Sequence, residues 1–202
     1  MRLISLLCLA VLAVAPAAPP ATLTAQERDA AVKYLEETSR TFVDSIENVS
    51  EAQWTFKAGP DRWSIAETAE HIAVSEGTLF QLITEKIVKG PAIPADTPKL
   101  EDKRIIEGVV DRTSKFQAPE MLRPTNRWAT RDALLKDFLA ERQKTIEYVK
   151  TTTEDLRSHG GPHPVMKMLD GYQWILFLGG HCARHTAQIE EVKTSPGYPA
   201  EP

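Results

Sequence analysis

Two histidines four residues apart, His181 and His185, are the residues with the clearest capacity for chemistry. On an α-helix this spacing stacks both imidazoles on one face, with Cβ atoms about 6 Å apart. Leu178 and Ile189 fall on the same stripe, so we predict that the pair points inward. An inward imidazole from a second helix could meet the pair, and His71 is the candidate for it.

Three imidazoles that meet inside a helical protein form a half-filled metal site. Zinc and similar divalent ions accept neutral imidazole nitrogen at about 2.0–2.1 Å, and catalytic sites often combine three protein ligands with a water. Imidazole suits zinc, nickel, copper and iron alike, so spacing does not identify the metal. Spacing also leaves open the structural alternative, in which each histidine is simply hydrogen-bonded in the core.

The elements that must position these histidines are predicted to be helices. Fourteen prolines divide the chain, and helices can lie only in the long proline-free windows. Four windows carry an apolar stripe at helical spacing, over about residues 25–48, 64–90, 130–150 and 170–192. Thr24 with Glu27, and Ser64 with Glu67, have the spacing of capping boxes. A shorter helix is predicted over 101–110, and no window shows the alternation of a strand.

Four amphipathic helices of about 18–26 residues are the components of a four-helix bundle, so we predict an all-α fold. The connection between the second and third helices, from Gly90 to Ala129, is too long for a simple hairpin. It could cross the bundle or cover one of its ends. No internal repeat of 20–50 residues is apparent, which argues against an α-solenoid.

Length and composition set outer limits on the class of protein. The chain has 202 residues, 42% hydrophobic and 26% charged, which fits one globular domain better than two. The net charge of −4 argues against a nucleic-acid partner, because such proteins usually carry a basic stripe. The sequence contains no phosphate-cradling glycine loop, dinucleotide fingerprint, G-x-S-x-G elbow or H-E-x-x-H helix.

Residues 1–25 are predicted to be a signal peptide. One positive charge precedes an apolar run over residues 3–14, and small residues and prolines follow. The run is shorter than the ~20 residues that span a bilayer, so we expect no stable membrane span. The expected location is the periplasm or the extracellular space, with cleavage after Ala17 or Ala25. An uncleaved N-terminal anchor or a buried helix start is the alternative.

Export changes the cysteine count of the working protein. Cys8 lies in the apolar run, so the mature chain would keep only Cys182. One thiol cannot close an internal disulfide, and the core alone must stabilise the fold. We expect a single domain over residues 26–195 and a short tail over 196–202.

Two segments of the chain resemble the DinB-like family. Residues 59–72, GPDRWSIAETAEHI, are similar to its second-helix entry, where W-S-hydrophobic-x-E leads to a metal-binding histidine. Residues 171–189, GYQWILFLGGHCARHTAQI, are similar to its last helix, where H-x-x-[RK]-H-x-x-Q-I carries two further ligands. The resemblance spans roughly residues 25–193.

The resemblance implies a DinB-like four-helix bundle that holds a divalent metal ion, Zn, Ni, Fe or Mn, through His71, His181 and His185. We expect an exported metal-dependent enzyme, hydrolase-like, acting on a small molecule. A non-catalytic metal- or ligand-binding bundle is the alternative. A thiol S-transferase, an activity found in the family, is disfavoured because small thiols are abundant mainly in the cytosol. Homodimerisation through exposed bundle faces stays open.

Three residues near the predicted ligands have both a functional and a structural interpretation. Glu67 could act as a general base, although its capping role explains it equally well. Arg184 could hold an anionic substrate, but we favour a solvent-facing side chain beside Glu190 or Glu191. Cys182 is offset by about 100° from the neighbouring histidine around the helix, so we predict a buried and inert thiol.

Other residues are predicted to have structural roles. The glycine- and proline-rich segment that contains His159 and His163 is interpreted as a solvated connection, rather than a cover over the metal. Trp63 and Trp174 are predicted to pack in the core near the site, and an aromatic pocket for substrate is the alternative. Gly179–Gly180 is expected to let another backbone approach closely.

Overall fold

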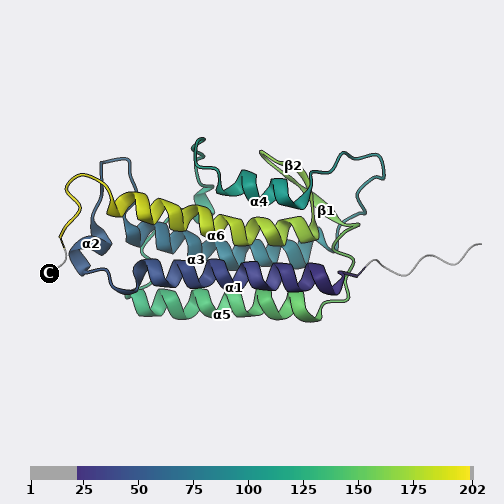
Figure 1. The fold of residues 1–202 in the computed structure, drawn as a ribbon, viewed down its shortest axis with the longest axis horizontal. Helices are drawn as coiled ribbons and strands as arrows, with labels where there is room; N and C mark the ends of the chain where they lie inside the picture. Colours follow the sequence, from purple (N-terminus) through teal and green to yellow (C-terminus); the bar gives the residue numbers. More distant parts are fainter. Residues whose placement is uncertain (1–21, 201–202) are drawn as a thin grey trace, which may run out of the picture.

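Four long helices form the bundle in a computed structural model that describes residues 22–200 (Figure 1). They are α1 (Ala25–Glu47), α3 (Ile65–Leu82), α5 (Arg131–Thr151) and α6 (Gly171–Lys193). The predicted all-α four-helix fold is confirmed. Most of the predicted signal peptide and the last two residues of the tail lie outside the described residues. None of the helices within 22–200 has the length and apolarity needed to cross a membrane.

The bundle helices begin at capping residues that the sequence marks. Thr24 and Ser64 each accept a hydrogen bond from the backbone N–H three residues on. The backbone N–H of each cap in turn donates to the carboxylate of Glu27 or Glu67, as predicted. Asp170 caps α6 in the same way. Because such caps stabilise a helix by about 0.5–2 kcal/mol, they fix where the bundle helices start.

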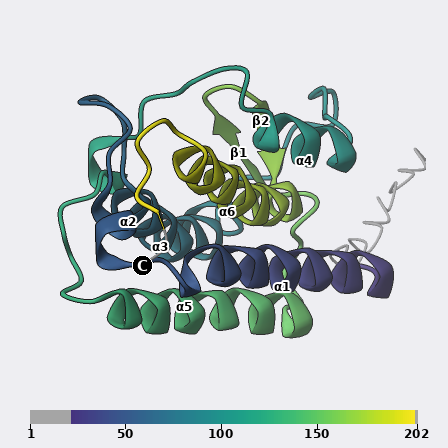
Figure 2. The ribbon, with the colours of Figure 1, turned by 60° about the vertical axis from the view of Figure 1, so that its left-hand side comes forward.

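The helices have an arrangement that explains the long connection. Both α1 and α3 pack on α5 and α6, so α1 and α3 occupy opposite corners of the bundle. Figures 1 and 2 show α1 and α6 running in one direction and α3 and α5 in the other. Because α3 and α5 are parallel neighbours, the chain must return along the bundle between them. A π-helical turn (Ile83–Ile87) continues α3, and the chain that follows contains α4 (Asp102–Val110) and a 3-10 turn, η2 (Glu120–Leu122).

The shorter elements differ from the prediction. A hairpin of β1 (Gly160–His163) and β2 (Lys167–Asp170) precedes α6, where no strand was predicted. Its four-residue strands are too short to show alternation, and β1 reads Gly-Gly-Pro-His. The interpretation of this segment as a solvated connection is wrong, because it packs on α6. A five-residue helix, α2 (Glu51–Thr55), was also missed, since five residues show no apolar stripe.

The core includes a buried ion pair as well as apolar side chains. Arg142 of α5 donates to both carboxylate oxygens of Glu76 in α3, at 2.8 and 2.7 Å. It also donates to the backbone oxygen of Leu35 and the hydroxyl of Thr38, both in α1. A buried charge is tolerated only when it is paired and hydrogen-bonded, so these contacts set the register of three helices.

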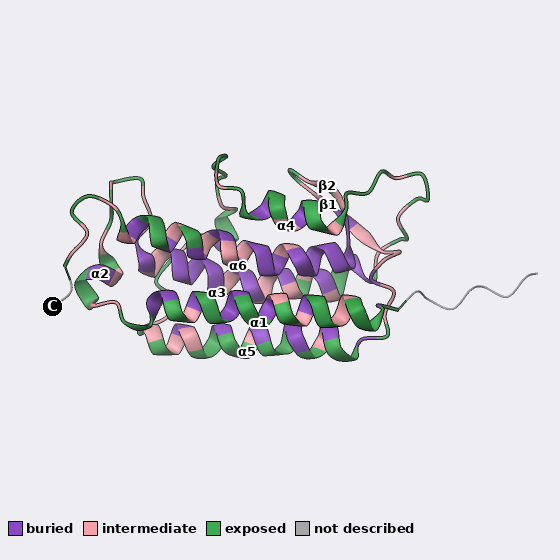
Figure 3. Cartoon of the chain, in the orientation of Figure 1, coloured by how far each residue is buried: buried purple, intermediate pink, exposed green. Residues whose placement is uncertain are grey.

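Helix α6 is buried along most of its length (Figure 3). Its inner side faces the bundle, and α4 packs on its other side. A Cβ at Gly180 would overlap Cγ1 of Val109 in α4, and one at Gly179 would lie 2.9 Å from Cδ1 of Tyr34 in α1. The close approach predicted for this glycine pair is therefore made by side chains of two neighbouring helices, not by another backbone.

Arg157 connects the ends of three helices near the hairpin. Its guanidinium lies 2.6 Å from carboxylate oxygens of Glu27 in α1 and Asp102 in α4, and 3.2 Å from Asp170 at the start of α6. The same group lies 4.0 Å from the ring centroid of Tyr172. This network fixes α4 against α6 at the hairpin end of the bundle.

We expect Gly180→Ala to destabilise the protein by about 1–3 kcal/mol, because the added methyl overpacks the contact with Val109. Alanine is otherwise the better helix former by about 1 kcal/mol. Gly77→Ala in α3 is the matched control, since a Cβ there meets only the Glu141 side chain, at 3.5 Å. Urea unfolding should show a loss for Gly180→Ala, partial recovery on adding Val109→Ala, and no loss for Gly77→Ala. Equal responses at both glycines would contradict this packing.

Candidate metal centre

The three predicted histidines meet at the contact between α3 and α6. His71 comes from α3 and His181 and His185 from α6, and their ligand-capable nitrogens all lie within 4.8 Å of one another. Nε2 of His71 is 3.2 Å from Nε2 of His181. The ring centroids of His71 and His185 are 4.5 Å apart. We call these residues the histidine triad.

One nitrogen pair of the triad has the separation that a divalent metal ion requires. Two nitrogens on a tetrahedral ion, each about 2.0–2.1 Å from it, are about 3.3 Å apart. The 3.2 Å between the Nε2 atoms of His71 and His181 matches that separation. The residues present are therefore a suitable ligand set, and their role as ligands remains a prediction.

Hydrogen bonds made by Nδ1 of two rings direct the Nε2 atoms of these rings toward the other histidines of the triad. His71 Nδ1 lies 2.8 Å from the backbone oxygen of Leu122 in η2, and a carbonyl can only accept. The proton of neutral His71 is thus on Nδ1, and Nε2 carries a lone pair. His185 Nδ1 is similarly 2.9 Å from Oε1 of Gln188. Metal-ligating histidines usually donate their other N–H to such an oxygen.

The surroundings keep all three imidazoles uncharged near neutral pH. Burial lowers the pKa of His71, and it lowers the pKa of His185 to about 3. Burial, reinforced by the two neighbouring imidazoles, holds the pKa of His181 well below its usual value. Metal ions bind the neutral form of imidazole, so no proton need be displaced from the ligand nitrogens at pH 7.

The triad is partly exposed to solvent. His71 is buried, whereas His181 and His185 are partly exposed. Within residues 22–200, no cysteine, aspartate or glutamate joins the group as a fourth ligand. The rings of Trp63 and Phe177 border it, 5.0 Å from His71 and 5.9 Å from His181. Three ligands with an open side are typical of catalytic metal sites, whereas structural sites are closed by four.

Comparison with known proteins decides the family. The family model of the DinB superfamily matches residues 34–189, more than half of the chain. This chain belongs to the DinB superfamily. It is 25% identical over 150 residues to YuaE, an uncharacterized protein of Bacillus subtilis (strain 168), covering 74% of this chain and 89% of YuaE.

A solved structure supports the fold of this DinB protein. YfiT from Bacillus subtilis is described as a probable metal-dependent hydrolase with an unusual four-helix bundle topology. The two structures align with a TM-score of 0.55, covering 90% of this chain and 94% of YfiT, at 16% sequence identity. At that identity the likeness establishes the bundle and not the reaction.

Two residues beside the triad, Glu67 and Cys182, make structural contacts. The Glu67 carboxylate accepts a hydrogen bond from the backbone N–H of Ser64, at 2.8 Å, and from Lys57, at 2.9 Å. Glu67 is thus the capping-box partner of Ser64, the N-cap of α3, which is one of the two roles that the sequence allowed. Cys182 is buried, and burial raises the pKa of its thiol to about 11. A thiol that stays protonated is inert as a nucleophile, as predicted.

Both interpretations of Arg184 are wrong. Its side chain is buried, and it donates to the backbone oxygens of Val109, Asp111 and Ser114. It therefore holds the end of α4 and the chain that follows against α6 in this DinB protein. Glu191 pairs instead with Arg112, at 2.6 Å. Helical periodicity could not reveal this, because it does not show that α4 covers this side of α6.

One of the two tryptophans lies in the core, and the other lies at the border of the triad. Trp174 is buried in the core, and its indole N–H donates to the backbone oxygen of Gly161, at 3.3 Å. Trp63 is partly exposed and faces His71, so its predicted core position is wrong and it belongs to the border of the triad. Phe177 also lies at this border, where it was not predicted. Its place four residues before His181 was the available signal.

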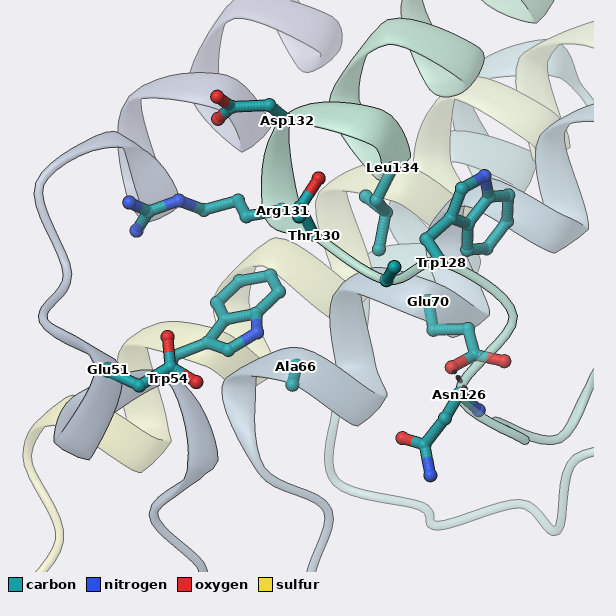
Figure 4. Close-up of a pocket in the computed structure, with 11 residues that line it drawn as sticks. Glu51, Trp54, Ala66, Glu70, Asn126, Trp128, Thr130, Arg131, Asp132 and Leu134 are labelled. Atoms are coloured by element: carbon teal, nitrogen blue, oxygen red, sulfur yellow. Dashed lines mark hydrogen bonds between the residues drawn. The ribbon is translucent and has the colours of Figure 1, made fainter.

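A separate hollow of about 300 Å³ lies at the end of the bundle near α2 (Figure 4). Trp54 and Trp128 line it, but it contains no histidine or cysteine. Its buried carboxylate, Glu70, is already engaged by the backbone N–H groups of Thr125 and Asn126, at 2.6 and 2.8 Å. Glu70 thereby anchors the chain just after η2, whose carbonyl orients His71.

We expect Arg184→Met to destabilise the protein by about 2 kcal/mol, because it leaves partly buried carbonyl groups without their donor. Hydrogen exchange should accelerate in the segment that follows α4. The exposed Arg123, whose side chain donates to the nearby Ala118 oxygen at 3.2 Å, provides the control variant Arg123→Met. Similar exchange in both variants would show that Arg184 does not hold this segment.

Proposed function

We propose that this protein binds one divalent metal ion through His71, His181 and His185 and uses it to hydrolyse a small molecule. The main support is the geometry of the triad. It consists of three neutral imidazoles, two of them oriented by oxygen acceptors, and it is open on one side. When bound, such an ion polarises a carbonyl and lowers the pKa of water.

The residues around the triad would orient the metal ligands and exclude part of the water from the site. The Leu122 carbonyl and the Gln188 amide oxygen fix the orientation of two of the three rings, so their ligand nitrogens are oriented before a metal ion binds. Trp63 and Phe177 restrict water beside the triad, and burial of His71 closes its inner side. Electrostatic interactions with a substrate are stronger at such a partly desolvated site.

The reaction class draws support from YfiT, which is described as a probable metal-dependent hydrolase and shares the bundle. Hydrolysis is favoured over a purely structural metal because the described residues supply three ligands rather than four. An all-imidazole set favours Zn, Ni or Fe over Mn, which prefers oxygen ligands. The net charge of −4 favours a small molecule over a nucleic acid as substrate.

We also propose export, on the sequence of residues 1–25 alone. If that segment is a signal peptide, the fold favours cleavage after Ala17 over Ala25. Leu23 is buried, and Thr24 caps α1. Cleavage after Ala25 would remove both and leave Glu27 without its capping partner, whereas cleavage after Ala17 keeps them.

The first test is metal binding. We expect the untagged protein to bind one equivalent of Zn²⁺ or Ni²⁺, and His181→Ala to lose more than about 100-fold in affinity, since it removes a ligand. Competition with a chromophoric chelator gives the affinity, and elemental analysis gives the stoichiometry. His159→Ala is the matched control, because His159 contacts the Gly90 oxygen at 2.7 Å, outside the triad. Equal affinities of the two variants, or no stoichiometric metal in the wild type, would exclude the metal site.

The second test is turnover. We expect hydrolysis of at least one class among small esters, amides and lactones, lost on treatment with dipicolinate and restored by the metal. His181→Ala should lower kcat/KM by more than about 100-fold, whereas His159→Ala should leave it unchanged. A metal-loaded protein that hydrolyses none of these substrates would favour the non-catalytic alternative. Consumption of an electrophile only when a small thiol is added would favour the transferase.

A further inference from the structure

The β1–β2 hairpin places a fourth histidine beside the triad. The ring of His163 lies 4.5 Å from that of Phe177 and 5.4 Å from that of Trp174. Phe177 lies 5.9 Å from His181, on the same face of α6 and one turn earlier. Phe177 therefore lies in contact range of both His163 and His181, one of the predicted metal ligands.

Backbone hydrogen bonds fix the tautomer of His163. Its Nδ1 lies 3.2 and 3.1 Å from the backbone N–H groups of Val165 and Met166, which can only donate. Nδ1 must therefore present a lone pair, and the proton of the neutral ring lies on Nε2. Burial lowers the pKa of His163, which keeps the ring neutral near pH 7. No residue within 22–200 accepts a hydrogen bond from this Nε2–H.

The turn that holds His163 includes an uncommon backbone conformation. Lys167, where β2 begins, has a φ of 63°, in the left-handed region that a side chain disfavours. Such residues persist only where the surrounding structure imposes them. The hairpin thus keeps His163 oriented, with its one unused donor fixed in position.

We propose that His163 is a substrate-positioning residue, whose Nε2–H donates to an oxygen of the substrate at the end remote from the metal. The inference rests on the proposed function and narrows its substrate class. A neutral N–H donor binds a carbonyl or carboxylate oxygen and offers nothing to an ammonium group. The substrate would carry a metal-binding group at one end, an oxygen acceptor at the other, and an apolar segment along Phe177.

The test uses Co²⁺-loaded protein, in which the visible spectrum reports ligands that reach the metal. The probes are dicarboxylates from malonate to adipate and the monocarboxylates of the same chain lengths. For at least one length we expect the wild type to bind the diacid about tenfold tighter, beyond the twofold statistical advantage of two carboxylates. Metal content is measured in every variant.

Two substitutions separate the two nitrogens of His163. In His163→Asn the amide oxygen can still accept from Val165 and Met166, but the distal donor is lost. We expect this variant to keep its fold and its Co²⁺ and to lose the diacid preference. In His163→Gln the amide N–H can reach the position of Nε2, so part of the preference should return. A purely structural His163 would show the reverse order, since only asparagine preserves the hairpin bonds.

The outcomes distinguish this inference from the function on which it rests. A diacid preference that persists in His163→Asn, or that is missing from the wild type at every length, overturns the role of His163 alone. A wild type that binds no Co²⁺, or whose Co²⁺ spectrum no carboxylate changes, overturns the open metal site and this inference with it. The spectrum taken before any acid is added shows whether Co²⁺ binds, and the titration with the monocarboxylates shows whether the metal site is open.

Discussion

The contact between α3 and α6 is the interaction on which the rest of the structure depends. It brings His71 against His181 and His185, and so removes three polar rings from much of their water. A buried polar group without a partner costs about 1–3 kcal/mol, so this contact is stable only if the far nitrogens find acceptors. The Leu122 carbonyl and the Gln188 amide meet that demand for two of the rings. The position of η2 is thus tied to the chemistry of the triad.

The long connection between α3 and α5 follows from the same contact. It supplies the Leu122 carbonyl, and Glu70 holds the chain that comes next. It also supplies α4, which covers α6 through the contact at Gly180 and through Arg184. A helix covered on both sides is held in register more firmly than one at a bundle surface. The connection therefore helps to position the triad in addition to joining α3 to α5.

Local interactions made much of this architecture predictable from sequence. Capping pairs and apolar stripes depend on residues within one or two turns, so the four bundle helices were predicted to within a few residues. The spacing of His181 and His185 likewise placed both on one face of a helix. Features set by distant segments were not predictable. Arg184 was misjudged because nothing local shows that α4 covers it, and any residue at position 122 offers a carbonyl.

Two pairs of histidines with the same spacing show why secondary structure must come first. His181 and His185 share a helix and lie side by side, with ring centroids 4.5 Å apart. His159 and His163 are also four residues apart, but glycine and proline between them exclude a helix, and an extended chain separates them by roughly 13 Å. One bonds to the Gly90 oxygen, and the other packs on Phe177. The same pattern thus gives two imidazoles side by side on α6 and a single oriented N–H on the hairpin, and only the fold distinguishes the two arrangements.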